Sequence, residues 1–521
     1  MAAACSDGGR SLVSHAAQVC LTCKARKKKC DKTLPSCGCC IRKRLRCAYS
    51  TPQTQARAQL RSHALPSLPE SDTFQHSLSP FVLSQTIPLA PVESATSLNL
   101  EVHRLIRTTG QFVDDVSAHY FQGIHRYLPV ISRTRFHDSL ITLGATPSAD
   151  FSVLLLAICV VTSSPAVRRR RENATSTSSI DRRQLLLTAK SLLAQVQGSF
   201  PVSVHLIQAA LLLSLHEYAE GRPDDALASI ASCARMAYAA RIHVRDVSSC
   251  AFTSPLTPST KSEIATPTST DVVTNADGWL QAEEAANTWW GIVICERRYI
   301  CDASVLDQPL VTTFPGADAR LPAEPEMLEH NGPSTIDRIP YVPVHSMESA
   351  YIKEFGRAAQ ATWYLEQILK SFGVPGLDTR LDQLTSVDIA LQRFLGMLML
   401  QCHSRTQMSC EAMTIAIRAF FALHSHILDL QLQPVAMMNR PIDEWIACSH
   451  TALDTGVKMV VDIVETLDNA ETHTFHVVAL SYTYIVRAAL RYIARRGLLG
   501  EKDGWLRGAE ERLRSSLERF I

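Results

Sequence analysis

From about residue 100 to the end of the chain, apolar side chains recur every three or four residues, and alternating runs are almost absent. Residues 185–196 and 202–219 show this helical spacing clearly. Pro223 and the two aspartates that follow it are typical of the start of another helix. The pattern therefore predicts an all-α body over residues 100–521. Further helices are predicted at 348–371, 386–422, 443–468, 475–495 and 504–520.

Two stretches are apolar on every face. Residues 289–295 (WWGIVIC) should lie at the centre of the helical body. Residues 151–161 (FSVLLLAICVV) fall short of the roughly eighteen apolar residues of a membrane span, so they predict a buried helix. We therefore expect no membrane partner.

The pattern is interrupted in several places. Residues 1–19 are expected to be a disordered lead. Residues 50–99 are expected to be a flexible linker, because they contain six prolines, which break helices, and many Ser, Gln and Thr residues. A mobile insert is expected at 247–277 and a proline-punctuated loop at 314–343. The linker prolines exclude a coiled coil. If the chain forms a homodimer, the helical body must mediate it.

A cysteine repeat occupies residues 20–49. Two triplets with the spacing C-x2-C-x6-C follow each other at a shift of seventeen residues. So short a segment cannot bury enough apolar surface to fold unaided, so it needs a covalent or metal staple. The two triplets are Cys20, Cys23, Cys30 and Cys37, Cys40, Cys47.

Zinc fits this repeat better than disulfides. The N-terminus has no secretory signal, so the thiols are expected to stay reduced, and paired C-x2-C units are then typical metal ligands. Two tetrahedral Zn²⁺ ions need eight ligand positions. Six sulfurs supply eight if two of them bridge, and Cys20 and Cys37, the first of each triplet, are the natural bridging pair. Cys39 is expected to be a non-ligand. The alternative is a basic, thiol-rich tail that binds no metal.

The distribution of charge along the chain indicates that its N-terminal part binds nucleic acid. Residues 20–47 carry ten Lys or Arg against one acid, Asp31, and six thiolates with two zinc ions remove only two of these positive charges. The net charge of +2 therefore divides into +9 over residues 1–50 and −7 over the rest. A basic head on a mildly acidic body is typical of a DNA reader whose body stays off the DNA.

Residues 20–49 resemble the fungal zinc binuclear cluster (Zn2Cys6) DNA-binding domain, whose pattern C-x2-C-x6-C-x6-C-x2-C-x6-C they match without a gap. The resemblance implies that a short helix after Cys23 enters the major groove of DNA. It also implies that Arg26 and Lys27 read a CGG-type triplet. Phosphate contacts are the expected role of five further basic residues: Lys24, Lys28, Arg42, Lys43 and Arg44.

The body resembles a second family, the fungal-specific transcription factor (middle homology) domain, over roughly residues 100–420. Three segments carry the resemblance: 120–136 (YFQGIHRYLPVISRTRF), 232–244 (SCARMAYAARIHV) and 283–309 (EEAANTWWGIVICERRYICDASVLDQP). Ala285 and Ala286 stand where relatives carry basic residues.

The sequence therefore predicts a small zinc-stapled N-terminal module, with two short helices around a binuclear zinc cluster, joined by a disordered linker to a large all-α domain. The expected function is a nuclear, sequence-specific regulator of RNA polymerase II transcription that contacts double-stranded DNA and the transcription machinery. Relatives of this build often regulate secondary-metabolite gene clusters. Two alternatives remain open: an enzyme targeted to DNA, with its active site in the body, and a thiol or metal sensor without sequence readout. The sequence contains no catalytic motif of a known class.

Overall fold

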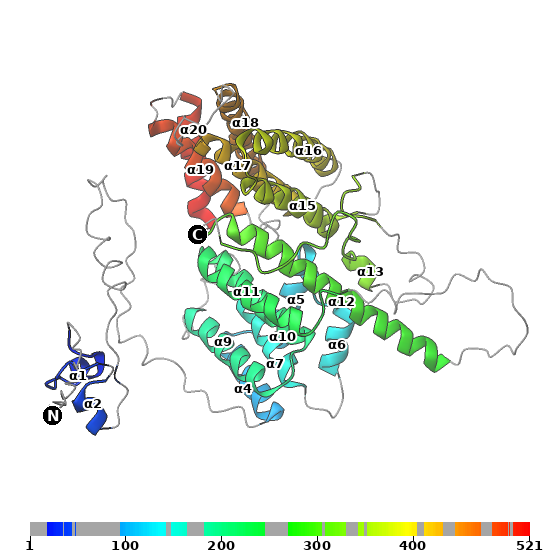
Figure 1. Ribbon diagram of the computed structural model, residues 1–521. Coiled ribbons are helices and arrows are strands. Elements are labelled where there is room, and N and C mark those ends of the chain that lie inside the picture. Colours follow the sequence, from blue (N-terminus) through cyan, green and yellow to red (C-terminus); the bar gives the residue numbers. More distant parts are fainter. Residues whose placement is uncertain are drawn as a thin grey trace, which may run out of the picture. The chain divides into compact units, whose positions relative to one another are not determined.

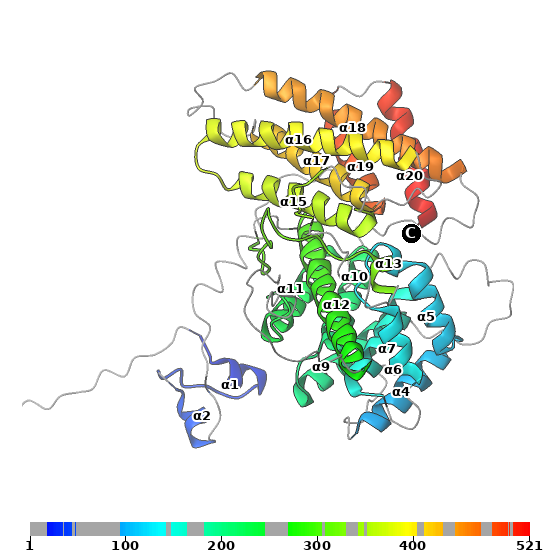
Figure 2. The same cartoon turned by 90° about the vertical axis from the view of Figure 1, so that its right-hand side faces the viewer.

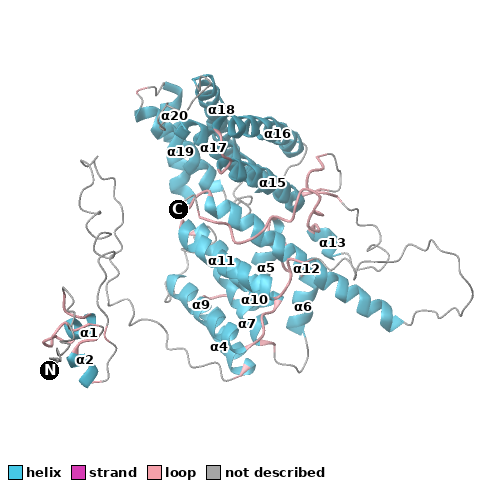
Figure 3. Ribbon diagram, in the orientation of Figure 1, coloured by secondary structure: helices cyan, strands magenta, loops and turns pink. Residues whose placement is uncertain are grey.

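The structure is a computed structural model. It describes residues 18–34, 36–43, 47, 94–141, 147–163, 182–244, 269–304, 308–329, 342–347, 352–403, 411–430, 443–469, 482–498, 500 and 504–520. The chain divides into two compact units between residues 84 and 85. Both are helical (Figure 1, Figure 3), and an isolated β-bridge joins Arg320 to Pro343. The predicted fold class, a small cysteine-rich module followed by an all-α body, is confirmed.

The second unit has two lobes. The first lobe, residues 94–304, is organised around α10, which packs against α7, α9, α11 and α12. Every residue from Leu206 to Tyr218 is buried, so apolar side chains dominate this segment on all sides. The elements of this lobe are α4 (Ala95–Thr108), α5 (Val113–Gln122), η2 (Ile124–Arg126), α6 (Arg133–Ile141), α7 (Ala149–Thr162), α9 (Arg182–Ser199), α10 (Val204–Ala219), α11 (Pro223–Ala239) and α12 (Ser269–Ile300).

The second lobe, residues 352–520, is organised around α17, which packs against α15, α16, α18 and α19. Figure 2 shows its long helices stacked beyond the end of α12. Its helices are α15 (Glu354–Phe372), α16 (Leu377–His403), α17 (Glu411–Leu430), α18 (Asp443–Asn469), α19 (Tyr482–Leu498) and α20 (Gly504–Phe520). A short helix, α13 (Pro325–Glu329), lies in the segment between the lobes and contacts α6.

Both predictions about apolar stretches are confirmed. Residues 151–161 lie in α7, where every side chain from Phe151 to Thr162 is buried. Residues 289–295 lie in α12, and Trp289 and Trp290 retain 5% and 4% exposure. One described helix, α17, is long and apolar enough to cross a membrane by length and composition, but 72% of its apolar window is buried inside the protein. That burial is typical of a core helix.

Polar side chains fasten α12 to the segment after η2. Asn287 Nδ2 donates to Pro129 O at 3.1 Å and to Ala323 O at 2.8 Å, and Ser132 N donates to Glu284 Oε1 at 3.0 Å. Gly291 permits the close approach, because a Cβ there would lie 2.8 Å from Val130. The 120–136 and 283–309 segments, which were singled out separately in the sequence, are therefore one packed assembly.

The lobes meet through ion pairs in which most of the charged side chains are buried. From the end of α12, Arg297 Nε donates to Glu366 Oε2 of α15 at 2.8 Å, and Arg298 pairs with Glu411 of α17. Asp302 accepts bonds from Arg418 of α17 and Arg491 of α19. We call these contacts the interlobe ion pairs.

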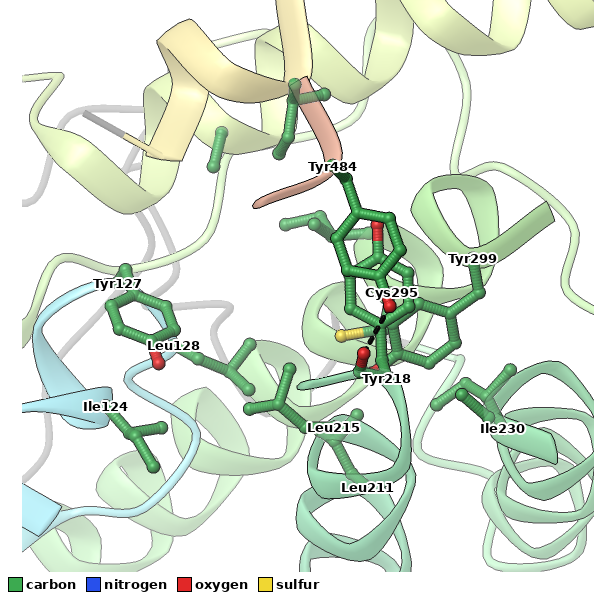
Figure 4. Close-up of a cluster of buried hydrophobic side chains, with 14 of the residues drawn as sticks. Ile124, Tyr127, Leu128, Leu211, Leu215, Tyr218, Ile230, Cys295, Tyr299 and Tyr484 are labelled. Carbon is green, nitrogen blue, oxygen red and sulfur yellow. Dashed lines mark hydrogen bonds between the residues drawn. The ribbon is translucent and has the colours of Figure 1, made fainter. Parts of the chain in front are cut away.

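Three tyrosines pack beside the interlobe ion pairs. Figure 4 shows Tyr218, Tyr299 and Tyr484 gathered from α10, α12 and α19. The rings of Tyr218 and Tyr484 stack with centroids 3.8 Å apart, and those of Tyr218 and Tyr299 at 4.5 Å. The Tyr484 hydroxyl also donates to the carbonyl oxygen of Tyr218. The lobe contact therefore combines aromatic stacking with ionic pairing.

Several predicted boundaries were wrong. The single helix predicted at 386–422 is two helices, α16 and α17, and α16 begins as early as Leu377. Helix α4 begins at Ala95, inside the predicted linker, because the Ser94 hydroxyl caps it through the Ser97 amide. Helix α12 begins at Ser269, inside the predicted insert, and the predicted loop 314–343 contains α13. The described part of the region predicted at 475–495 is helical from Tyr482 to Leu498.

Candidate metal centre and nucleic-acid interface

The cysteine repeat of the sequence is a structural repeat in the first unit. Helix α1 (Leu21–Ala25) begins after Cys20, whose Sγ accepts from the Cys23 amide at 3.4 Å. Helix α2 (Gly38–Arg42) begins after Cys37, whose Sγ accepts from the Cys40 amide at the same distance. The first cysteine of each triplet is thus an N-cap, and the C-x2-C spacing brings the second cysteine back over it. The helix predicted after Cys23 in fact includes Cys23.

The six sulfurs of the repeat come together in two groups of four. All sulfurs within a group lie within 4.8 Å of one another, and Cys20 and Cys37 belong to both groups. One group adds Cys23 and Cys30 to the shared pair, and the other adds Cys40 and Cys47. The arrangement agrees with two tetrahedral sites that share two bridging thiolates.

The sulfur separations fit zinc and not disulfides. Cys20 Sγ lies 3.7 Å from Cys37 Sγ and from Cys40 Sγ, and Cys23 Sγ lies 3.7 Å from Cys37 Sγ. A disulfide bond needs about 2.05 Å. Zn–S bonds of about 2.3 Å in a tetrahedron place neighbouring sulfurs about 3.8 Å apart. The thiols therefore have the spacing of a zinc–thiolate cluster.

The thiols of the cluster differ in acidity. Burial raises the pKa of Cys37 to about 12 and also raises the pKa values of Cys23 and Cys40. Hydrogen bonding to the backbone of Cys20 lowers the pKa of Cys30 to about 7. Because zinc binds thiolates, metal must displace protons from the buried sulfurs at neutral pH.

The surplus thiol stays outside both groups. Cys39 is partly buried and packs against the cluster, but it belongs to neither set of four. This placement agrees with a non-ligand neighbour.

The sequence reasoning missed a contact that ties the two half-repeats together. The Asp31 carboxylate, from the first half, accepts from the Gly38 amide at 3.1 and 2.9 Å and from the Thr33 hydroxyl at 2.7 Å. The bond from the Thr33 side chain is the main reason that the pKa of Asp31 is lowered. A Cβ on residue 38 would lie 2.5 Å from Asp31 Oδ2, so any other residue there would displace this carboxylate. The glycine that follows Cys37 was the feature of the sequence that could have indicated a close contact at this position.

The two predicted base-reading residues lie at the C-terminal end of α1. Arg26 is the C-cap, and Lys27 adopts a left-handed backbone with φ of 50°. The Lys27 amide donates to Lys24 O at 3.2 Å and the Lys28 amide to Cys23 O at 3.0 Å, which is the Schellman pattern. The backbone therefore turns sharply at Lys27 and leaves both side chains exposed.

The predicted phosphate-contacting residues surround this turn and the end of α2. Lys24, Lys28, Arg42 and Lys43 are all exposed, so they are available to a large anionic ligand. Arg44 lies outside the described residues. The structure thus places a positively charged, solvent-facing layer around a buried thiol core.

Comparison with known proteins addresses the nature of this module. Residues 18–56 match the fungal Zn(2)-Cys(6) binuclear cluster domain. A binuclear cluster binds two zinc ions, and two Zn²⁺ are the cofactors of this chain. Their fit rests on the donor set described above, six sulfurs in two overlapping groups of four.

A relative with a similar sequence is the transcription factor BOA15 of Botryotinia fuckeliana (strain B05.10). It is 28% identical over 134 residues, which is 26% of this chain and 69% of the relative. The binuclear cluster match and this similarity each cover only part of the chain.

Proposed function

We propose that the protein is a sequence-specific, DNA-binding transcription factor. The observation that carries the proposal is the pair of four-thiol groups sharing Cys20 and Cys37 beneath exposed basic side chains. The binuclear cluster match and the similarity to a relative named as a transcription factor support it. Zinc supplies the folding energy of the module, and the basic side chains supply the affinity for DNA.

The proposed ligand set follows the two thiol groups. Cys20 and Cys37 bridge the two ions, Cys23 and Cys30 complete one tetrahedron, and Cys40 and Cys47 complete the other. The chain's own part is to fix these sulfurs through the two cysteine caps and the Asp31 contact.

The proposed readout divides the basic residues into two roles. Arg26 and Lys27, at the turn that ends α1, contact base edges of a CGG-type triplet in the major groove. Phosphate contacts come from the surrounding residues Lys24, Lys28, Arg42, Lys43 and Arg44.

For the body, we propose a regulatory role without catalysis. The proposed domains are a lead at 1–19, the cluster at 20–49, a linker at 50–99 and an all-α regulatory domain at 100–521, of which roughly residues 100–420 form a fungal-specific transcription factor (middle homology) domain. The body connects the cluster to the transcription machinery of RNA polymerase II in the nucleus and pairs two chains as a homodimer. A secondary-metabolite gene cluster is the proposed setting.

The decisive experiment measures binding of the full chain to duplexes with a CGG triplet or a scrambled one, across a range of salt. A base-reading pair discriminates by about 1–3 kcal/mol, so we expect a preference of roughly 5- to 150-fold at each salt concentration. Overall affinity should fall as salt rises, because phosphate contacts release counterions. Equal affinity for both duplexes would contradict sequence readout and favour a thiol or metal sensor.

A further inference from the structure

The cysteine-rich module keeps one acid on a surface dominated by positive charge. Residues 20–47 contain ten Lys or Arg, and Asp31 is the acid among them. Its side chain is exposed, so its charge repels a phosphate backbone that approaches the module. By charge alone, an acid at this place weakens DNA binding. Its contacts within the chain supply a reason for its presence.

The Asp31 carboxylate joins the two half-repeats. Both of its oxygens accept from the Gly38 amide, at 3.1 and 2.9 Å, and Oδ1 also accepts from the Thr33 hydroxyl at 2.7 Å. Asp31 directly follows the last cysteine of the first triplet, and Gly38 directly follows the first cysteine of the second. The end of one half-repeat is therefore bonded to the start of the helix in the other.

This contact lies beside a residue that we assign to the DNA phosphates. Gly38 and Arg42 are four residues apart on α2, so they share one side of the helix. A Cβ on residue 38 would lie 2.5 Å from Asp31 Oδ2 and 3.4 Å from Arg42 Nη1, so the carboxylate and the guanidinium flank the same point. The hydrogen bond from Thr33 is the main cause that lowers the pKa of Asp31, and the charge of Arg42 adds to it.

We propose that Asp31 is a positioning residue for DNA binding, which holds α2 in place and keeps the Arg42 guanidinium where it meets a phosphate. The role deepens the proposed function and rests on it. Cys37 and Cys40 hold α2 through their thiols. The Asp31 carboxylate adds a third point of attachment, the Gly38 amide, and three points fix the direction of the helix that carries Arg42.

The test is binding of the full zinc-loaded chain to a CGG-containing duplex over a range of salt, with zinc content measured for every variant. Asp31→Ala removes a negative charge and should nevertheless weaken binding about tenfold. It should also lower the salt slope by about one unit, because the phosphate contact of Arg42 is lost. Binding as tight as that of the native chain, or tighter, would overturn the positioning role.

A second variant breaks the contact without changing the charge. Gly38→Ala places a Cβ 2.5 Å from Asp31 Oδ2, although alanine is the better helix former. It should therefore weaken binding as Asp31→Ala does. The conservative variant Asp31→Asn keeps an acceptor for the Gly38 amide and should recover binding to within about threefold of the native chain. Native binding by Gly38→Ala, or loss of zinc from both alanine variants, would refute the role.

A double-mutant cycle tests whether Asp31 acts through Arg42. Arg42→Ala should weaken binding about tenfold in the native chain and at most about twofold in the Asp31→Ala chain, because the contact is already lost there. Lys27→Ala is the matched control and should cost the same factor in both chains. Equal costs of Arg42→Ala in the two chains would contradict the proposal.

A scrambled duplex keeps the two proposals apart. Asp31 acts through a phosphate contact, so Asp31→Ala should weaken binding to the scrambled duplex by the same factor. A native chain without preference for the triplet, but with this loss on both duplexes, refutes sequence readout and not the positioning role. A preserved preference, with Asp31→Ala equal to the native chain, refutes the positioning role alone.

Discussion

At the residue scale, the two shared cysteines have a different status from the other thiols. Cys20 and Cys37 belong to both four-sulfur groups, so replacing either one removes a ligand from each zinc site. We expect Cys37→Ser to lose both ions, whereas Cys39→Ser should lose neither. Zinc content per chain, measured after gel filtration, checks this. Two ions retained by Cys37→Ser would rule out the bridging assignment.

The basic residues allow a second prediction at this scale. Lys27→Ala should cost about 1–3 kcal/mol on a CGG-type duplex and little on random DNA, because it removes a base contact. Lys43→Ala should weaken both duplexes alike and lower the salt slope by about one unit, because it removes a phosphate contact. Titrations of the two variants at several salt concentrations check the difference. Matching behaviour of the two variants would remove the basis for assigning Lys27 to the bases.

The thiol groups could be predicted from spacing alone, because six cysteines in a fixed repeat leave few ways to build two tetrahedra. The Asp31 contact could not, because the glycine at 38 is compatible with a close approach but does not indicate that a carboxylate seven residues earlier makes it. The left-handed backbone at Lys27 could not be predicted either, because this conformation is usually expected at glycine and not at lysine.

At the scale of elements, the helices with continuous periodicity and clear ends were predicted well. Helix α20 matches its predicted range at both ends, and α18 differs by one residue. The prediction gave one helix where the structure describes two, α16 ending at His403 and α17 beginning at Glu411, and the residues between them, 404–410, lie outside the described ranges. There the start of α17 coincides with a tertiary contact, the pairing of Glu411 with Arg298, which sequence periodicity does not report.

Helix α15 depends on a carboxylate from outside its own sequence. Glu324 accepts from the amides of Lys353 at 2.8 Å and Gly356 at 3.0 Å, and thereby caps the helix start. Burial raises the pKa of Glu324 to about 7, although these amide bonds act in the opposite direction. Folding therefore favours the protonated form, so this contribution to stability is full below about pH 4.5 and is lost as the pH rises through about 7.

Glu324→Gln should remove this pH dependence. Relative to the native chain, its free energy of unfolding should fall less between pH 4.5 and 7.5, by on the order of 1–3 kcal/mol. Urea unfolding at several pH values measures the difference. Glu444→Gln, an exposed carboxylate on α18, is the control and should track the native chain. Parallel curves for native and Glu324→Gln chains would show that the carboxyl titrates normally.

At the scale of the whole molecule, the two compact units should respond differently to metal removal. Zinc binding is largely the folding energy of a cysteine-stapled module, so a chelator should unfold residues 20–47. The helical body has its own extensive core and should keep its helix content and its thermal midpoint. Circular dichroism with limited proteolysis, before and after chelation, checks both parts. A body that loses helix when zinc is removed would contradict independent units.

DNA spacing is the second prediction at this scale. If two chains pair through their bodies, each cluster is tethered by about forty-five linker residues, with a root-mean-square span of about 35–40 Å. Full-length protein should therefore bind paired triplets more tightly than one triplet, with a shallow dependence on their separation. Gel-shift titrations over a series of spacings measure this. A sharp optimum already shown by a fragment of residues 1–96 would reveal a pairing element in the linker.

The interlobe ion pairs bear on how this protein can be dissected. A truncation after residue 304 removes Glu366, one of two acidic partners of Arg297, and Glu411, the acidic partner of Arg298. Stranding a charge that the fold has buried costs about 3–5 kcal/mol, a large share of the stability of a typical domain. A C-terminal deletion that silences a reporter gene would then report misfolding, and it would say nothing about an activation region. Mapping experiments on this chain should neutralise both members of a pair together and leave the backbone whole.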